Sequence, residues 1–561
     1  MTARITEPAP DSAAWTPPAA VVGDAPPRTM LQRLRRRVAP DGTLRRDLVR
    51  LVFFDLPAWS AAGARGILPA LAALRRTAQR EWLPLAAAAP ARFGAMLWAA
   101  AGLREPLSDH AYEFARLRRA RRARYVVETR RVRCVCEPGL VSVVLPVYNG
   151  AQYVREAIDS VLAQDYAAWE LLIVDDGSTD DTPAIVADCA ARDERIRVLR
   201  QVNRKLPAAL NAGFAAARGE YLTWLSDDNR FKPSFLGRMV ACLRRNPGWD
   251  MVYANLDIID DQGRPLRGAD WYADRQCPPG SEHICLPHDT SELNMWGNNH
   301  VGAAFLYRAA VAHLIGPYDE RRFGVEDYDY WLRINAVLTL RHADFDDPVY
   351  DYRLHGKSLT ARDAEVGITR ARAGLMAFEA WRRACWLAPL TWAVSYEADD
   401  ARAASWAARL AALARRAGHL RTGRLGPARA PERSTPTARV LITANQDAVP
   451  DATAPVHEAR ILVYVGHRPL RRPPAGWNLT IATEESLSPV DSPGERLGWL
   501  VIADAPALFS AIDLRSRAEY LLRAGDAGIE SVRSGPRKPA VAGWLRRLLI
   551  EPVERRRIRA E

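Results

Sequence analysis

Three apolar segments, each followed directly by polar or acidic residues, constrain the fold of this chain most strongly. They are residues 141–147, followed by Tyr148 and Asn149; residues 171–174, followed by Asp175 and Asp176; and residues 221–225, followed by Ser226, Asp227 and Asp228. We expect three parallel strands here, because parallel strands buried on both faces read as continuous apolar runs. Ligands bind at the carboxyl edge of such a sheet, so the three ends predict one site for a nucleotide and a divalent metal.

Amphipathic segments connect these strands. Residues 151–163 carry apolar side chains at helical spacing, and residues 179–191 open with an Asp/Thr-rich N-cap region. Alternation of strand and helix predicts an α/β domain with a mostly parallel sheet and helices on both of its faces.

The length of 561 residues and the 48% of hydrophobic residues predict several domains, each with a buried core. We expect a disordered tail at 1–28, a helical N-terminal region at 29–135, the α/β domain at 138–360, a helical extension at 361–420, a Pro-containing linker at 421–438, a small α/β unit of unknown role at 439–530, and a basic tail at 531–561. No oligomeric state follows from this organisation.

Charge and cysteine content limit the kinds of binding partner and the cellular compartment that we expect for this protein. The net charge is +12, but 74 of the 78 basic residues are Arg, a skew that codon usage can produce, so we expect no nucleic-acid partner. Seven scattered Cys indicate a reducing compartment. With no secretory signal pattern and no apolar run of about 18 residues, we expect a cytoplasmic protein. The basic segments 116–133 and 531–561 fit either solvated helix faces or a peripheral contact with the inner membrane surface.

The first two strand ends suit a nucleoside. Pro146 has no N–H and ends its strand, which exposes Tyr148 and Asn149 to a base or ribose. A carboxylate of Asp175 or Asp176 could accept a hydrogen bond from a base N–H. The alternative is that both acids cap the following helix.

The third strand end and a downstream helix suit group transfer. Asp227 and Asp228 offer hard oxygen ligands to Mn²⁺ or Mg²⁺, with positions left for a diphosphate. Asp327, beside Glu326, could act as a general base on an acceptor hydroxyl, or the two acids could simply favour a helix N-terminus. His355 lies in a segment with Lys357 and could contact the diphosphate or the metal.

A second metal-ligating pattern lies between these motifs. Cys277, His283, Cys285 and His288 fall within twelve positions and could bind zinc, although their spacing fits no standard zinc finger. The surrounding loop, about residues 265–300, also carries Trp271 and Trp296, which could stack on acceptor sugar rings.

Taken in order, these motifs resemble those of the family 2 glycosyltransferases, which have the GT-A fold. The resemblance covers about 40% of the chain and is carried by residues 145–149, 174–180, 211–213, 217–221, 226–228, 326–327 and 355–358. It implies a nucleoside diphosphate sugar donor, with UDP favoured, a divalent metal and inversion at the sugar carbon. One departure is Leu225, where the family often has an acid.

The resemblance also implies roles. Asp175 or Asp176 recognises the nucleoside, Asp228 binds metal and diphosphate with help from Asp227, and Asp327 is the base. Lys205 and Asn211 line the donor pocket.

The predicted function is therefore transfer of a sugar to a hydroxyl of a glycan or lipid-linked acceptor, in cell-surface polysaccharide synthesis. A noncatalytic glycan-binding or scaffold protein with a degenerate transferase domain is the alternative. A nucleotidyltransferase would need a phosphate-binding loop rich in Gly, Arg or Lys, and residues 149–153 do not supply one.

Overall fold

The computed structural model describes residues 131–267, 282–288, 290, 293–296, 299–387, 393–416, 437–445, 449, 458–467, 472–486 and 497–524. The expectations for residues 1–28, 29–130, 421–436 and 531–561 lie outside these ranges, and so do Trp271 and Cys277.

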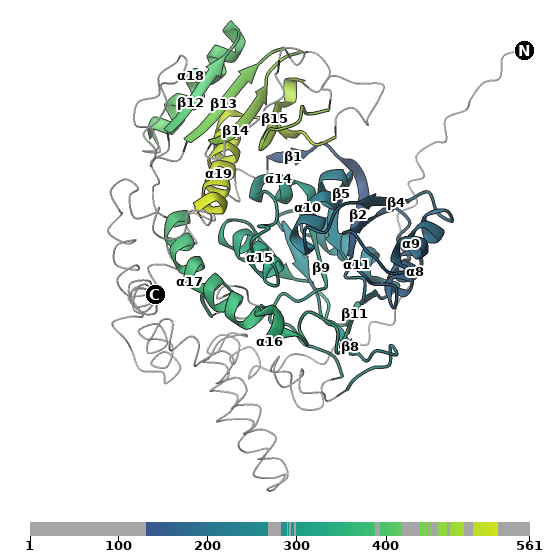
Figure 1. Ribbon diagram of the computed structural model, residues 1–561. Helices are drawn as coiled ribbons and strands as arrows, with labels where there is room; N and C mark the ends of the chain where they lie inside the picture. Colours follow the sequence, from purple (N-terminus) through teal and green to yellow (C-terminus); the bar gives the residue numbers. More distant parts are fainter. Residues whose placement is uncertain are drawn as a thin grey trace, which may run out of the picture.

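A seven-stranded sheet forms the centre of the larger unit (Figure 1). Its strands, in spatial order, are β10 (Leu340–His342), β7 (Met251–Tyr253), β9 (Phe305–Arg308), β5 (Gly219–Trp224), β2 (Glu137–Val147), β3 (Trp169–Asp175) and β4 (Ile196–Arg200). Only β9 runs antiparallel to its neighbours; the other pairings are parallel. The prediction of a mostly parallel α/β sheet from the three apolar runs is confirmed.

Helices pack on both sides of this sheet (Figure 1). They are α8 (Val154–Leu162), α9 (Thr182–Ala190), α10 (Leu206–Ala216), α11 (Phe235–Arg245), α14 (Ala309–Ile315) and α15 (Glu326–Val337). Helix α10 lies close to β2 and β3 because Gly213 has no side chain: a Cβ there would stand 2.4 Å from a methyl group of Val144. This contact brings α10 directly onto the central strands.

A small sheet lies beside the carboxyl end of β5. It consists of β6 (Arg230–Phe231), β11 (Tyr350–Arg353) and β8 (Asp257–Ile259). Two short helices, α13 (Leu293–Trp296) and α16 (Asp363–Val366), and the long helix α17 (Ile368–Leu387) complete this side of the larger unit.

A second sheet is formed mainly by the C-terminal part of the chain (Figure 1). Its strands, in spatial order, are β1 (Val132–Cys134), β16 (Leu500–Ile502), β15 (Leu479–Thr483), β14 (Glu458–Tyr464), β13 (Thr437–Thr443) and β12 (Ala393–Ala398). All are parallel except β1, which pairs antiparallel with β16. Helices α18 (Ala401–Arg416) and α19 (Ala505–Ala524) pack on this sheet and on each other, and η4 (Glu484–Ser486) follows β15.

The second sheet extends beyond the range 439–530 that the sequence suggested for the small unit. Strand β12 lies within the expected helical extension 361–420, and β1 lies within the expected helical N-terminal region. Both are edge strands that form by pairing with partners distant in the sequence, and local periodicity carries no information about such pairing.

The two units meet where α19 packs against α14. The guanidinium of Arg515 on α19 covers Gly316, where a Cβ would stand 2.1 Å from Nη1, and its Nε donates to the carbonyl oxygen of Asn478 at 3.0 Å. Arg321 donates to the carbonyl oxygen of Leu522 across the same junction. Among the helices that the structure describes, none has the length and hydropathy to cross a bilayer.

Candidate active site

A cavity of about 260 Å³ opens at the carboxyl end of β5. Asp228, Glu326 and Asp327 supply its acidic lining. Its other walls come from the β5 end, the small sheet and the first turns of α15 and α17, and include Trp224, Leu256, Ile284, Leu286, Asn299, Tyr352, Ser358, Ile368 and Arg372. Residues that lie far apart in the sequence thus converge on one space.

Asp227 and Asp228 stand side by side where β5 ends. Oδ2 of Asp228 accepts a hydrogen bond from Nε2 of His355 at 3.0 Å, while Oδ1 is buried and has no hydrogen-bond partner. Burial, together with the negative charge of Asp228, raises the pKa of Asp227 well above its usual range. A buried, unpartnered carboxylate oxygen beside a second carboxyl group fits a divalent cation, which would offset both the repulsion and the missing partner.

The turn after β5 is held by Arg353, which is almost fully buried. Its Nε donates to the carbonyl oxygen of Asp228 at 2.8 Å, and its backbone N–H donates to Oδ1 of Asn229 at 2.8 Å. Its Nη2 reaches Oε2 of Glu156 on α8 at 2.5 Å. The Asp228 backbone is therefore fixed from two neighbouring elements.

Glu326 and Asp327 open helix α15 but differ in environment. Glu326 is buried, and burial, followed by the charge of Asp327, raises its pKa to about 8, although the Gly324 N–H donates to Oε2 at 2.6 Å. Asp327 is less buried, and its Oδ2 accepts a hydrogen bond from Nδ2 of Asn299 at 3.0 Å. At neutral pH Glu326 is therefore mainly protonated, and its burial sets it apart from the half-exposed Asp327.

The loop after β2 is joined to the loop after β3. Asn149, with a left-handed φ of 54°, accepts a hydrogen bond from the Thr179 N–H at 2.8 Å and donates its own N–H to Oγ of Ser178 at 3.0 Å. Tyr148 follows the β2 residue Pro146 by two positions, and its side chain is 51% exposed. The exposed ring at this sheet edge suits a flat ligand group.

The two acids after β3 are both buried but make different contacts. Oδ1 of Asp175 accepts the Ser178 N–H at 2.8 Å, a contact within the turn that precedes helix α9, and Oδ2 lies 3.3 Å from Nε of Arg200. Oδ1 of Asp176 accepts hydrogen bonds from Nε2 of Gln201 and from the Arg204 N–H, both at 2.8 Å. The geometry thus assigns Asp175 to the turn and Asp176 to the neighbouring 201–204 loop.

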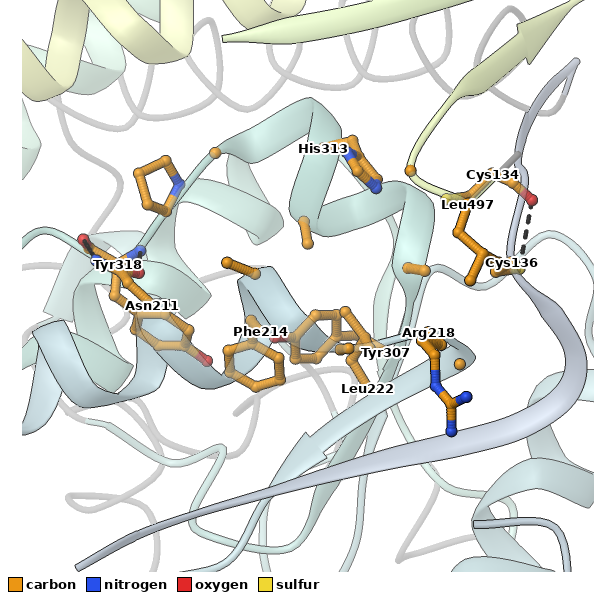
Figure 2. Close-up of a pocket in the computed structure, with 18 of the residues that line it drawn as sticks. Cys134, Cys136, Asn211, Phe214, Arg218, Leu222, Tyr307, His313, Tyr318 and Leu497 are labelled. Atoms are coloured by element: carbon orange, nitrogen blue, oxygen red, sulfur yellow. Dashed lines mark hydrogen bonds between the residues drawn. The ribbon is translucent and has the colours of Figure 1, made fainter. Parts of the chain in front are cut away.

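Asn211 is not among the residues that line this cavity. Its side-chain amide clamps Tyr318 by donating to the carbonyl oxygen at 3.0 Å and accepting from the N–H at 2.8 Å. It lines a separate pocket of about 270 Å³ at the junction of the two units, where Figure 2 shows it beside Tyr318 and Phe214. Lys205 is exposed, with a φ of 73°, and its neighbour Leu206 lines the acidic cavity.

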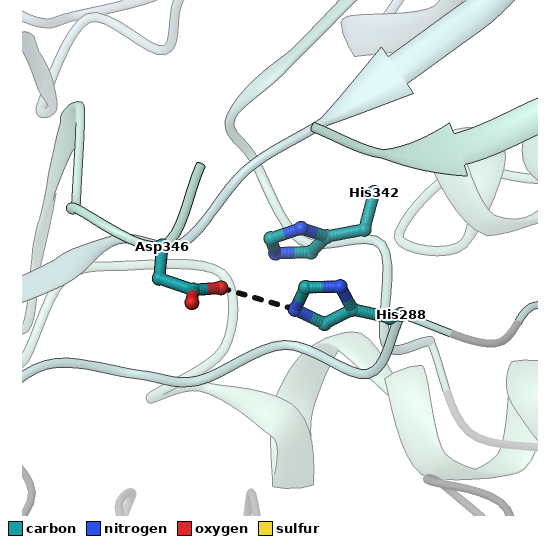
Figure 3. Close-up of side chains that lie close together, drawn as sticks. All are labelled: His288, His342 and Asp346. Atoms are coloured by element: carbon teal, nitrogen blue, oxygen red, sulfur yellow. Dashed lines mark ion pairs between the residues drawn. The ribbon is translucent and has the colours of Figure 1, made fainter. Parts of the chain in front are cut away.

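The four residues of the zinc hypothesis are not gathered by the part of the chain that the structure describes. Cys277 lies outside that part, and the Cys285 thiol interacts with His283, whose pKa it raises. His288 instead stacks on His342, with ring centroids 3.9 Å apart, and its Nε2 lies 3.2 Å from Oδ1 of Asp346 (Figure 3).

The trio of His288, His342 and Asp346 has the composition of a metal site. However, Nδ1 of His342 faces the carbonyl oxygen of Ala343 at 2.8 Å, and Nε2 faces Oδ1 of Asn255 at 3.0 Å. That Oδ1 also accepts the Leu286 N–H, so both ring nitrogens of His342 face oxygen atoms of the protein. A metal bound by His342 would have to replace one of these two contacts.

The family comparison agrees with the predicted resemblance. Residues 142–312 match the model of the glycosyl transferase family 2, so this segment is a family 2 glycosyltransferase domain with the GT-A fold. An uncharacterized glycosyltransferase of Rickettsia felis is 34% identical over 211 residues, which cover 37% of this chain and 33% of the relative. A second, from Rickettsia prowazekii, is 32% identical over 202 residues, which cover 36% of this chain and 60% of the relative.

The chain therefore spans about a third to three fifths of the length of these two relatives. Among solved structures, S. aureus TarS 1–349 in complex with UDP is 18% identical with a TM-score of 0.33, covering 44% of this chain and 69% of that one. The Pyrobaculum calidifontis mannosyltransferase in complex with GDP-Man and Mn²⁺ is 18% identical with a TM-score of 0.31, covering 55% and 90%. Likenesses at this level carry no argument about the site.

Proposed function

We propose that this chain, whose residues 142–312 form a family 2 glycosyltransferase domain, is an inverting, metal-dependent glycosyltransferase. It moves a sugar from a nucleoside diphosphate, UDP by preference, to a hydroxyl of a glycan or lipid-linked acceptor in cell-surface polysaccharide synthesis. The observation that carries this proposal is the buried, unpartnered Oδ1 of Asp228, which shares one cavity with Asp327.

The donor end of the site is built from Asp228 and His355. Asp228, assisted by Asp227, would hold Mn²⁺ or Mg²⁺, and the ion would neutralise negative charge on the departing nucleoside diphosphate. Nε2 of His355, 3.0 Å from Asp228, keeps that carboxylate oriented. Tyr148 and Asp176 lie at the same sheet edge and suit the base and ribose.

Asp327 is the proposed general base. It takes the proton of the acceptor hydroxyl as that oxygen forms a bond to the anomeric carbon, and the bond from this carbon to the diphosphate oxygen breaks with its electron pair. The nucleoside diphosphate leaves from the opposite face, so the configuration inverts. Protonated Glu326 adds no second negative charge beside the base at neutral pH.

The test uses the purified full-length chain and a panel of UDP-glucose, UDP-N-acetylglucosamine and GDP-mannose, with Mn²⁺ or EDTA. Donor binding is measured by calorimetry, and donor turnover by release of the nucleoside diphosphate. We expect metal-dependent binding that is lost in Asp228→Asn, and turnover lower by about 10²- to 10⁴-fold in Asp327→Asn with binding retained.

Asp504→Asn is the matched control, since Asp504 also follows a strand end but already pairs with Arg131. This variant should leave donor binding and donor turnover unchanged. Absence of donor binding under every metal condition would instead favour the noncatalytic glycan-binding alternative.

A further inference from the structure

One cation lines the acidic cavity and belongs to none of the motifs above. Arg372 lies in the second turn of α17, four residues after Ile368 and four before Met376, so the three side chains share one face of the helix. Ile368 packs at Gly324, where a Cβ would stand 3.2 Å from its Cγ1. Met376 accepts a hydrogen bond from the Tyr328 hydroxyl at 3.3 Å. Arg372 therefore faces the first turn of α15, which carries Glu326 and Asp327.

The guanidinium of Arg372 has no hydrogen bond or ion pair within the described ranges, although it is half-buried. Arg382, further along α17, shows the usual arrangement for this helix: its Nη1 lies 2.6 Å from Asp329, and its Nη2 lies 2.6 Å from Glu379. A guanidinium stays charged at every physiological pH. A guanidinium that has no partner and lies on the wall of a cavity is suited to bind an anionic group of a ligand.

Resting on the proposed function, we propose that Arg372 binds a carboxylate or phosphate carried by the sugar unit of the acceptor. The donor diphosphate is proposed to lie at Asp228 and His355. The residues one turn before and one turn after Arg372 on α17 contact Gly324 and Tyr328, which flank the proposed base Asp327. The lining of the same cavity also includes the apolar Leu256, Ile284 and Leu286, which suit the C–H face of a sugar ring. The acceptor class is thus an acidic glycoside.

A matched set of small glycosides tests this assignment. The probes are p-nitrophenyl β-D-glucoside, which is neutral, the corresponding β-D-glucuronide, which carries a carboxylate, and the glucoside 6-phosphate. Their binding to the full-length chain with UDP and Mn²⁺ is measured by calorimetry. The variants are Arg372→Gln and Arg372→Lys, with Arg370→Gln as an exposed control on the same helix.

We expect the native chain to bind at least one anionic glycoside more tightly than the neutral one. Arg372→Gln should weaken that binding about 10- to 100-fold, the size of a lost charge-assisted contact, and Arg372→Lys should restore part of it. Binding of the neutral glycoside should weaken less than binding of the anionic one, and binding of every glycoside by Arg370→Gln should stay within about twofold of the native chain. Which anionic glycoside responds separates the carboxylate from the phosphate.

Two results would overturn the proposal. Equal binding of neutral and anionic glycosides by the native chain would remove the need for a cationic subsite. A weaker donor affinity in Arg372→Gln would move the residue to the donor diphosphate. Failure of the proposed function would appear separately, as no donor binding or hydrolysis by the native chain.

Discussion

The two sheets of this molecule both present acids beyond the carboxyl ends of their strands, but the side chains of these acids make different contacts. In the second sheet, the acids within the described ranges that follow strand ends all have partners: Asp399 with Thr443, Asp400 with the Ala403 N–H, Glu484 with Arg133, Glu485 with Arg402, and Asp504 with Arg131 and the Ala507 N–H. In the first sheet, Oδ1 of Asp228 is buried without one. Strand-end acids become a candidate site where the fold does not supply enough partners.

The largest expected difference is in the loss of stability when an ion pair is removed from the larger unit or from the second sheet. Arg382 is 1% exposed and bridges Asp329 and Glu379, which are fully buried, whereas the side chains of Arg133 and Glu484 are 67% and 46% exposed. Arg382→Met should lower the free energy of unfolding by about 3–5 kcal/mol, because among the described residues it leaves the buried Glu379 without a paired cation and Asp329 paired with Arg333 alone. Arg133→Met should cost about 0–1 kcal/mol. Urea unfolding at pH 7 measures both, and equal losses would contradict the comparison.

An effect of intermediate size is expected when either of two glycines that follow strands is replaced by alanine. A Cβ on Gly150, after β2, would stand 2.0 Å from Oδ2 of Asp227, and a Cβ on Gly466, after β14, would stand 2.3 Å from the carbonyl oxygen of Ala444. Alanine at either position should cost about 1–3 kcal/mol by overpacking. Only Gly150→Ala displaces a carboxylate of the candidate site.

Donor affinity therefore separates the two glycine variants. Gly150→Ala should weaken metal-dependent donor binding about tenfold, and Gly466→Ala should leave it unchanged. Calorimetric titration on samples checked for a folded state by circular dichroism gives the readout. If both variants bind donor normally, Asp227 does not support the metal ligand.

The smallest expected effect is the stability difference between Glu326→Gln and the native chain, and this difference grows with pH. The pKa of Glu326 is raised to about 8 in the folded chain, so the folded state binds its proton more tightly than the unfolded state does. That stabilisation is complete below the unfolded pKa of about 4.5 and is lost as pH rises through 8. Relative to the native chain, Glu326→Gln should gain stability from pH 5 to about pH 8 and then level off.

Urea unfolding at each pH unit between 5 and 9 follows this difference. Because the charge of Asp327 contributes to the raised pKa of Glu326, Asp327→Asn should move the pH-dependent window to lower values. A difference between Glu326→Gln and the native chain that does not change with pH would mean that Glu326 keeps its ordinary pKa.

The sequence predicted those parts of the molecule that local pattern determines. Continuous apolar runs identified β2, β3 and β5, because buried parallel strands need them on both faces. The acids after β5 and at the start of α15 were likewise visible as local motifs, and the structure brings Asp228 and Asp327 to one cavity. Their roles stay predictions.

Features that depend on distant contacts could not be predicted in the same way. Nothing local to Asn211 indicates that it clamps the backbone of Tyr318, and nothing local to residues 132–134 indicates a strand at the edge of the second sheet. Arg372 was missed for a related reason: in an Arg-rich helix, only the packing of Ile368 and Met376 distinguishes the arginine that faces the cavity.

The position of β1 has a consequence for biosynthesis. Strand β1 pairs with β16, for example Val132 with Ile502. Because β1 precedes the segment 142–312 and β16 follows it, the ribosome makes the whole of that segment between the two strands. Domains generally fold as units, the N-terminal one first. The unit built on the seven-stranded sheet can therefore form while the second sheet is incomplete, and β1 must remain unpaired until β16 has been made.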